Sequence, residues 1–247
     1  MSTDQYKKEV SMMKLDRLIE LRENIPDITF PIDDQALLNR YENLYSGAIN
    51  DVLREFGRMD RALPNRIMPL REYKTIAGFA FTVKSAPTTV VRGEMEHRTR
   101  MLDAMHENAF VIWDTSNDNK STSWGGVMTA TAKGKKVKAA CVDGGIRDTH
   151  QILGADFPVF YRYRSSNGAL GRCLITDYQV PLEIGNVLIK PGDVIIGDVD
   201  GVLAIPREIA FEVLERAEEI RENEKKIFGW VKEGRSAKDI TDKGGYF

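Results

Sequence analysis

Residues 124–152 read WGGVMTATAKGKKVKAACVDGGIRDTHQI, and helix and strand signals alternate along this stretch. A glycine pair at 125 and 126 precedes a predicted helix, and the apolar segment VKAACV at 137–142 predicts a strand. A second glycine pair, at 144 and 145, predicts the turn that ends this strand before Arg147 and Asp148. Alternation of this kind is typical of α/β proteins.

The same pattern extends in both directions from this stretch. Upstream, IAGFAFTVKS at 76–85 and AFVIW at 109–113 predict strands, with a helix over 94–107 between them. The helix that contains the first glycine pair is expected over about 123–133. Downstream, short apolar segments separated by turn residues predict strands of a compact second β layer, at 158–163, 186–189, 193–198 and 201–205. Pro206 is well placed to open a long helix that runs to about residue 234.

The N-terminal part is predicted to be helical. Apolar residues recur at helical spacing among charged ones over 5–24, which predicts an amphipathic helix. Asp33 or Asp34 can cap a second helix, and Ser46 can cap a third that ends before Gly57. We therefore expect an N-terminal helical extension over 1–45, one main domain over 46–235, and a C-terminal tail over 236–247.

Composition limits the class of protein. The 247 residues are 42% hydrophobic, which is enough for one sizeable core, and the 35 basic and 37 acidic residues form no long run of one sign. Nucleic acid and membrane are therefore not expected as partners. Cys141 and Cys173 form no C-x-x-C motif, which argues against a thiolate zinc site and a disulfide framework. The absence of a long apolar segment predicts a soluble, unprocessed protein of the cytoplasm.

The two glycine pairs and the residues after them form a candidate site. Glycines at 125 and 126 allow the backbone to approach a ligand, and free amides at a helix start can bind a carboxylate. Arg147 offers planar donors for carboxylate or enolate oxygens, and Asp148 offers a hard oxygen ligand for a divalent cation. Each feature also has a purely structural interpretation, as a tight turn and as a salt bridge at a helix start.

The spacing of these residues resembles a known family. Gly126, twenty intervening residues and Arg147-Asp148 form a G-x20-R-D motif similar to that of the RraA-like family, which includes the 4-hydroxy-4-methyl-2-oxoglutarate aldolases. The resemblance continues through AGFAFTVKS, VDGGIRD and VLIKPGDVIIGDVDGVLAIP, and it covers roughly residues 46–235.

The resemblance implies an α/β fold of the swivelling β/β/α type, with an N-terminal helical extension and a long C-terminal helix. It implies a homotrimer or homohexamer with sites between subunits. In such enzymes Arg147 would stabilise the enolate oxygen and Asp148 would anchor Mg²⁺ or Mn²⁺. The substrate carboxylate would be bound by Gly125, Gly126, Val127 and Met128.

Three carboxylate positions need separate comment. Many relatives carry an acidic residue where this chain has Gly126, and the aldolases usually carry another where it has Gln151. In the aldolases a glutamate from a neighbouring subunit's C-terminal region helps to hold the water shell of the metal, and Glu224 is the best counterpart. Glu224 lies in the middle of an apolar stripe of the C-terminal helix formed by Val213, Ala217, Ile220, Ile227 and Val231. A glutamate turned to solvent or paired with an arginine is the alternative.

The expected function is cleavage of a 4-hydroxy-2-oxo acid to pyruvate, or decarboxylation of an oxaloacetate-like acid, through a pyruvate enolate. Two alternatives remain open: a non-enzymatic regulator that binds an RNA-degradation enzyme, as some members of the family do, and a lyase for a sugar-derived 2-oxo acid. For Asp143 we expect a role in the turn after its strand, with direct catalysis as the less favoured interpretation. For His97, His106 and His150 we expect positions at the surface.

Overall fold

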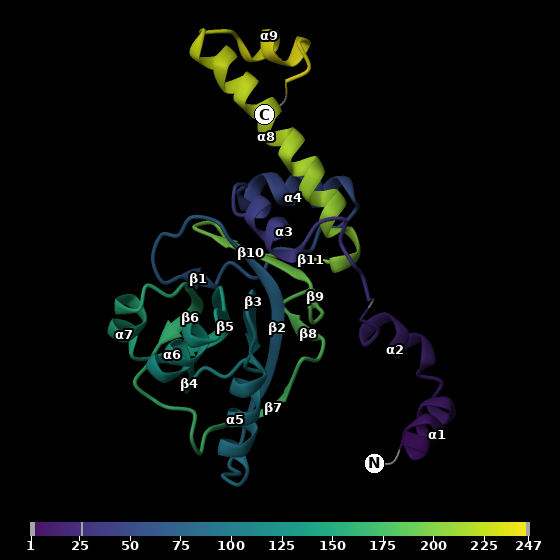
Figure 1. The fold of residues 1–247 in the computed structure, drawn as a ribbon, viewed down its shortest axis with the longest axis vertical. Coiled ribbons are helices and arrows are strands. Elements are labelled where there is room, and N and C mark those ends of the chain that lie inside the picture. Colours follow the sequence, from purple (N-terminus) through teal and green to yellow (C-terminus); the bar gives the residue numbers. More distant parts are fainter. Residues whose placement is uncertain (1–2, 26, 246–247) are drawn as a thin grey trace.

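A nine-stranded sheet forms the centre of the computed structural model, which describes residues 3–25 and 27–245 (Figure 1). Its strands lie in the order β1-β6-β5-β3-β2-β10-β11, with β4 also paired to β5 and β7 to β2. The strands are β1 (Met68–Pro69), β2 (Ile76–Pro87), β3 (Ala109–Asp114), β4 (Thr122–Trp124), β5 (Ala139–Ile146), β6 (Val159–Arg164), β7 (Cys173–Tyr178), β10 (Val194–Asp198) and β11 (Gly201–Ile205). A separate hairpin contains β8 (Leu182–Ile184) and β9 (Val187–Ile189).

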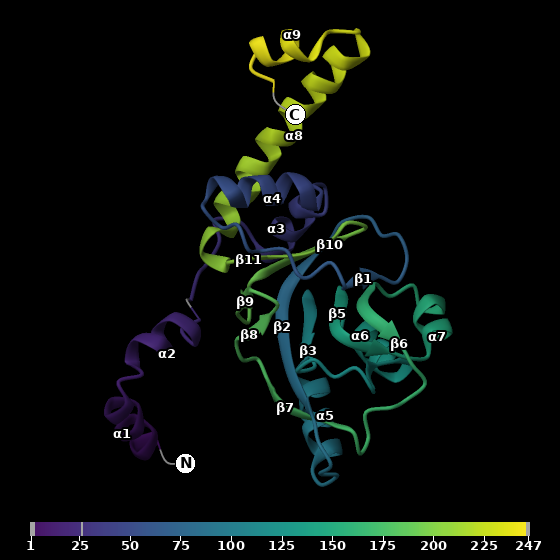
Figure 2. The same cartoon turned by 180° about the vertical axis from the view of Figure 1, so that it is seen from behind.

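Helices flank the sheet at several places (Figures 1 and 2). They are α1 (Thr3–Met13), α2 (Asp16–Arg22), α3 (Asp34–Tyr41), α4 (Ser46–Glu55), α5 (Glu94–Ala104), α6 (Gly126–Gly134), α7 (Thr149–Gly154), α8 (Ala210–Lys232) and α9 (Ala237–Asp242), with a 3-10 turn at Arg207–Ile209. None of the helices within 3–25 and 27–245 combines the length and apolar character needed to cross a membrane.

The four central strands β2, β3, β5 and β6 are parallel, and apolar residues cover both of their faces. On β3, Val111 and Trp113 face one apolar core while Phe110 and Ile112 face another. This period of two, with both sets buried, explains why the strand is continuously apolar in sequence. Helices α5, α6 and α7 enclose the first core, and the β8–β9 hairpin contributes to the second.

A third core forms where α3, α4 and α8 pack on β2, β10 and β11. The buried carboxylate of Asp198, at the end of β10, accepts hydrogen bonds from the backbone amide and the hydroxyl of Ser46 at 2.7 and 2.9 Å. It also accepts the amide of Asp200 at 3.0 Å. Asp198 therefore builds its own turn and supplies an acceptor at the start of α4.

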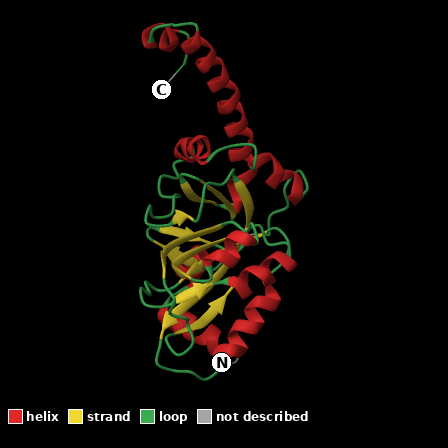
Figure 3. Ribbon diagram, turned by 90° about the vertical axis from the view of Figure 1, so that its left-hand side faces the viewer, coloured by secondary structure: helices red, strands yellow, loops and turns green. Residues whose placement is uncertain are grey.

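The terminal segments project from this body. Figures 1 and 3 show α8 extending away from the sheet, with α9 folded back beside its end. Only the first half of α8 contributes buried residues, from Ala210 to Ile220, and Phe228 farther along is 64% exposed. Helix α2 has no buried residue. The expected N-terminal extension and long C-terminal helix are present.

Most predicted elements are confirmed, and four details are wrong. The helix expected over 5–24 is interrupted, because Lys14 adopts a left-handed conformation with φ of 54°. Ser46 does not cap α4 with its side chain, since the hydroxyl bonds to Asp198. Strands β6, β10 and β11 were expected in a second β layer, but they belong to the main sheet, where β6 pairs with β5 and β10 with β2.

The fourth error concerns the second glycine pair, which was expected to form a turn. Strand β5 continues through Asp143, Gly144 and Gly145 to Ile146. A Cβ atom at Gly144 would lie 2.6 Å from the Thr115 methyl, and one at Gly145 would lie 2.5 Å from the Tyr163 ring. The glycines are therefore needed for close packing of neighbouring segments within the sheet.

Candidate active site

The site begins where β5 ends. The Arg147 amide donates to the Trp124 carbonyl at 3.0 Å, so the chain after β5 stays beside β4. Asp148 then adopts a left-handed conformation with φ of 53° and precedes α7. Aspartate is one of the few residues other than glycine that tolerate this conformation. The backbone therefore turns sharply at Asp148, directly after Arg147.

The carboxylate of Asp148 is tied to the start of α6. Its Oδ2 atom accepts the Gly126 amide at 3.2 Å and lies 3.6 Å from Nε of Arg147. A Cβ atom at Gly125 would lie 2.8 Å from this same oxygen, so a side chain there would displace the carboxylate. The close approach observed here is to a side chain of the same chain, and the predicted approach of the backbone to a ligand stays a prediction.

Gly126 is restricted by a different neighbour. A Cβ atom at this position would lie 1.6 Å from Oε1 of Gln151, on α7. The two positions where relatives carry acidic residues are therefore adjacent in space. The amide side chain of Gln151 fills the volume that a side chain at 126 would need.

Arg147, Asp148 and the first turn of α6 line one cavity of about 450 Å³. Helix α5 contributes a further wall, and the loop before β7 closes another side. Among the described residues that line the cavity, three are arginines, namely Arg98, Arg147 and Arg172, and one, Asp148, carries a carboxylate. Because cations outnumber acids, the cavity is suited to a small anionic ligand.

The predicted site residues are thus partly brought together. Gly125, Gly126, Val127, Met128, Arg147 and Asp148 all line the cavity. Glu224 does not line it within one chain: it lies on α8, which leaves the body away from α6 (Figure 1). There the carboxylate of Glu224 accepts a hydrogen bond from the Tyr45 hydroxyl.

Sequence reasoning missed Arg98, which lies on α5 beside the cavity. A signal was present in the sequence, because Glu94, Arg98, Met101 and Met105 fall on one helical stripe. Glu94 and both methionines on this stripe are buried. Two charged residues on a stripe that is otherwise apolar indicate a buried ion pair.

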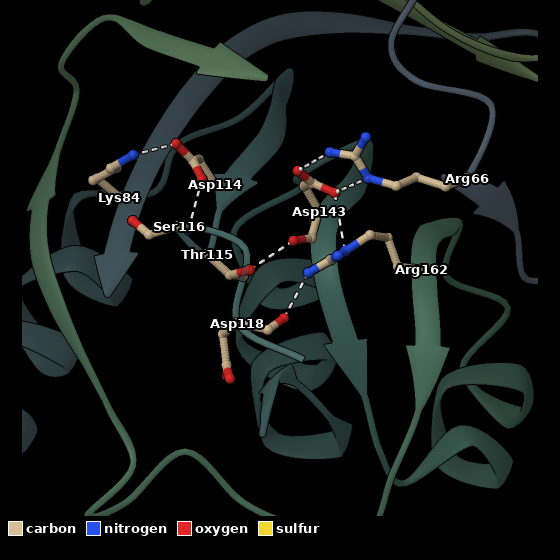
Figure 4. A network of polar contacts seen from close by, with 8 residues as sticks. All are labelled: Arg66, Lys84, Asp114, Thr115, Ser116, Asp118, Asp143 and Arg162. Carbon is tan, nitrogen blue, oxygen red and sulfur yellow. Dashed lines mark hydrogen bonds and ion pairs between the residues drawn. The ribbon is translucent and has the colours of Figure 1, made fainter. Parts of the chain in front are cut away.

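Asp143 belongs to a neighbouring network of polar contacts and not to the cavity (Figure 4). Its carboxylate is 4% exposed and accepts Nε and Nη2 of Arg66 at 3.2 and 2.9 Å. The guanidinium of Arg162 lies 3.1 Å from the same carboxylate. Asp114, directly opposite on β3, pairs with Lys84 and accepts the Ser116 amide.

This network fixes the end of β3 and the part of β5 that precedes the site. Thr115, after β3, donates its hydroxyl to the Asp143 carbonyl at 2.6 Å. Arg162 donates to the Asp118 carbonyl at 2.6 Å. Bonded in this way within β5, Asp143 has a structural role, and the sequence-based expectation that it bonds a turn after its strand is corrected. Nearby Cys141 is buried in β5, where burial raises the pKa of its thiol.

The two aspartates of this region should respond differently to neutralisation. Asp143→Asn would leave the half-buried Arg66 and the largely buried Arg162 without their counter-ion, and we expect it to lower the free energy of unfolding by about 3 kcal/mol. Asp148 is 36% exposed, and Asn keeps an acceptor for Gly126, so Asp148→Asn should change stability by less than about 1 kcal/mol. Denaturant unfolding of both variants measures this, and equal losses would contradict the assignment.

Comparison with known proteins gives a consistent picture. Residues 46–204 match the family model described as RraA-like, Aldolase/RraA. A putative 4-hydroxy-4-methyl-2-oxoglutarate aldolase of Halalkalibacterium halodurans is 32% identical over 158 residues, which are 63% of this chain and 71% of that protein. The matched regions span 31%, 66% and 71% of the lengths of three curated relatives.

Two solved structures share the fold. One, described as novel cellulases from microbes associated with the gut ecosystem, is 70% identical, has a TM-score of 0.86, and is matched over 90% of this chain and 100% of its own. The other is RraAS2 of Streptomyces coelicolor, described as an unusual member of the RNase ES inhibitor RraA protein family. It is 21% identical, with a TM-score of 0.71, over 80% of this chain and 98% of its own.

Proposed function

Because the chain belongs to the RraA-like family, we propose that it is a divalent-metal-dependent lyase that forms a pyruvate enolate. Its reaction would be the cleavage of a 4-hydroxy-2-oxo acid or the decarboxylation of an oxaloacetate-like acid. The observation that carries this proposal is the convergence of Arg147, Asp148 and the start of α6 on one cavity.

The start of α6 would bind the substrate carboxylate. The Gly126 amide is already used by Asp148, and the first bond of the helix runs from Thr129 to Gly125. The amides of Val127 and Met128 therefore have no acceptor within the helix. Two adjacent amides at a helix start form a favourable place for a carboxylate.

Asp148 would hold the divalent cation. Its side chain is 36% exposed, and Oδ1 accepts no hydrogen bond from a residue within 3–25 or 27–245. The same part of the chain contains no cluster of three or more His, Cys, Asp or Glu side chains that could bind a metal. A single carboxylate fits Mg²⁺ or Mn²⁺ that keeps water and substrate oxygens as its other ligands, and such an ion polarises the 2-oxo carbonyl.

Arg147 would act on the charge that develops during the reaction. When the bond between C3 and C4 breaks, its electron pair moves toward the C2 carbonyl and forms the enolate. The guanidinium of Arg147 can donate to that oxygen, and its planar geometry suits an oxyanion. Ordered water would accept the C4 hydroxyl proton in cleavage, and water would return a proton to C3 to give pyruvate.

The other functions considered have less support. Glycoside hydrolysis in most families needs two carboxylates on either side of the scissile bond, and the described lining of the cavity supplies only Asp148. A regulator of an RNA-degradation enzyme would not need Arg147, Asp148 and free helix amides in one cavity. A lyase for a sugar-derived 2-oxo acid would use the same groups and differs only in substrate.

Substitution of Arg147 tests the proposed chemistry. Arg147→Ala should lower kcat by about a hundredfold to a thousandfold, because one preorganised donor to a developing oxyanion is lost. KM should change much less, and Arg147→Lys should recover little, since lysine lacks the planar pair of donors. Arg164→Ala is a matched control, because Arg164 lies beside Arg147 but does not line the cavity. Near-normal kcat in folded Arg147→Ala would overturn the mechanism.

Removal of divalent cations tests the role of Asp148. We expect exhaustive chelation to abolish pyruvate release and added Mg²⁺ or Mn²⁺ to restore it. Asp148→Asn should raise the concentration of cation needed for half-maximal rate, because the carboxylate is the hard anchor. Coupled detection of pyruvate measures both effects, and full activity after chelation would reject a metal-dependent reaction.

We further propose that the protein is a homotrimer or homohexamer in which Glu224 reaches the site of a neighbouring subunit. Glu224→Gln should then lower activity, although the residue is outside the cavity of its own chain. If the impaired Arg147→Ala and Glu224→Gln chains are mixed in equal amounts and reassembled, about a quarter of the shared sites regain both groups. Recovery of activity supports a shared site, and an inactive mixture that light scattering shows to be a mixed oligomer contradicts it.

A further inference from the structure

Helix α5 buries a carboxylate beside the cavity. Glu94 is 2% exposed, and its Oε1 atom accepts both Nε and Nη2 of Arg98, at 2.9 and 2.5 Å. Its Oε2 atom has no hydrogen-bond partner in the described part of the chain. A buried carboxylate of this kind is strongly destabilising without its counter-ion, so the guanidinium of Arg98 is held in place.

The fixed guanidinium of Arg98 also lines the cavity. Two of its five N–H groups are used by Glu94. The Nη1 atom lies 3.9 Å from Sδ of Met128, and a thioether is a weak acceptor. Arg98 therefore presents strong donors to the cavity that no strong acceptor within 3–25 or 27–245 satisfies.

Arg98 and Asp148 line the cavity from different elements. Helix α6 contacts both α5 and α7, and Figure 1 shows it between them. Asp148, before α7, bonds to Gly126, whereas Arg98, on α5, contacts Met128. A ligand whose carboxylate binds the start of α6 would have its reacting carbon near Asp148 and could extend toward Arg98.

The unused donors of Arg98 favour such an extended ligand. Glu94 occupies only Nε and Nη2 of the guanidinium, so Arg98 can bind a second anion inside the cavity. Resting on the proposed function, we infer that Arg98, positioned by Glu94, binds a second carboxylate at the far end of the substrate. Arg98 is thus a specificity-determining residue that selects 2-oxo acids with two carboxylates over those with one.

Calorimetric titration with two unreactive probes tests this inference. 2-Oxoglutarate and 2-oxopentanoate have the same chain length, and only the first has a distal carboxylate. In the presence of Mg²⁺ the native protein should bind 2-oxoglutarate about tenfold to a hundredfold more tightly, as expected for a charge-assisted hydrogen bond. Arg98→Gln should reduce this ratio to about one and leave the affinity for 2-oxopentanoate unchanged.

The same helix provides a matched control. Arg100 pairs with Glu96 at the same spacing, but both side chains are more than 60% exposed and neither lines the cavity. Arg100→Gln should leave the ratio unchanged. Glu94→Gln should lower the ratio severalfold, because the Arg98 guanidinium is no longer held in position. The affinity for 2-oxopentanoate should stay the same, because the rest of the site is intact. If Arg98→Gln fails to fold because Glu94 is left as an unpaired buried charge, the double variant Glu94→Gln/Arg98→Gln is used in its place, since it removes both charges.

The titration separates this inference from the proposed lyase activity, because binding needs no turnover. If the protein has no lyase activity but its affinity ratio still depends on Arg98, the inference stands and the proposed function is wrong. Equal affinity of the native protein for both probes, or a ratio unchanged in Arg98→Gln, would overturn the inference. A ratio that falls only in Arg172→Gln would overturn it too, by assigning the second carboxylate to Arg172.

Discussion

The contact between the Asp148 carboxylate and the Gly126 amide is the constraint on which the site depends. It joins the starts of α6 and α7, which follow two different strands of the sheet. The approach is possible only because Gly125 has no side chain beside the carboxylate. One contact thus sets the positions of the helix amides, of Arg147 and of the candidate metal ligand together.

A rigid support lies behind this contact. Asp114 and Asp143 are directly opposite on β3 and β5, both are buried, and cationic side chains surround them (Figure 4). Buried ion pairs contribute little net stability, but loss of one partner is strongly destabilising. The arrangement therefore permits few alternative positions for the end of β3 and for β5 at Asp143, and a site built next to them keeps its geometry.

The sequence predicted local features well and contacts between distant segments less well. The continuous apolar segments of β2, β3 and β5 predicted these strands correctly, because strands buried on both faces need apolar residues throughout. Gly144 and Gly145 were misinterpreted, since the reason for the glycines is the position of Thr115 and Tyr163, which are far away in sequence. The pairing of β10 with β2 also joins segments that are far apart in sequence, and it was not predicted.

The candidate site shows the same division. The spacing of Gly126, Arg147 and Asp148 was readable because these residues flank one helix and one strand. Arg98 was missed because its partner Glu94 is also charged, and a pair of opposite charges on a helix usually indicates a solvent-exposed surface. The apolar residues on the same stripe distinguish the two cases, and the burial of Glu94 agrees with them. Glu224 cannot be placed against the cavity from one chain, since its proposed partner belongs to a neighbour.

The contact between positions 126 and 151 has a consequence for any substitution at either position. Gln151 occupies the volume that any side chain at 126 would require. The two positions are therefore coupled: a side chain at 126 requires that the Gln151 amide turns away or that residue 151 is shorter. A substitution at 126 thus changes the position of the residue 151 side chain as well.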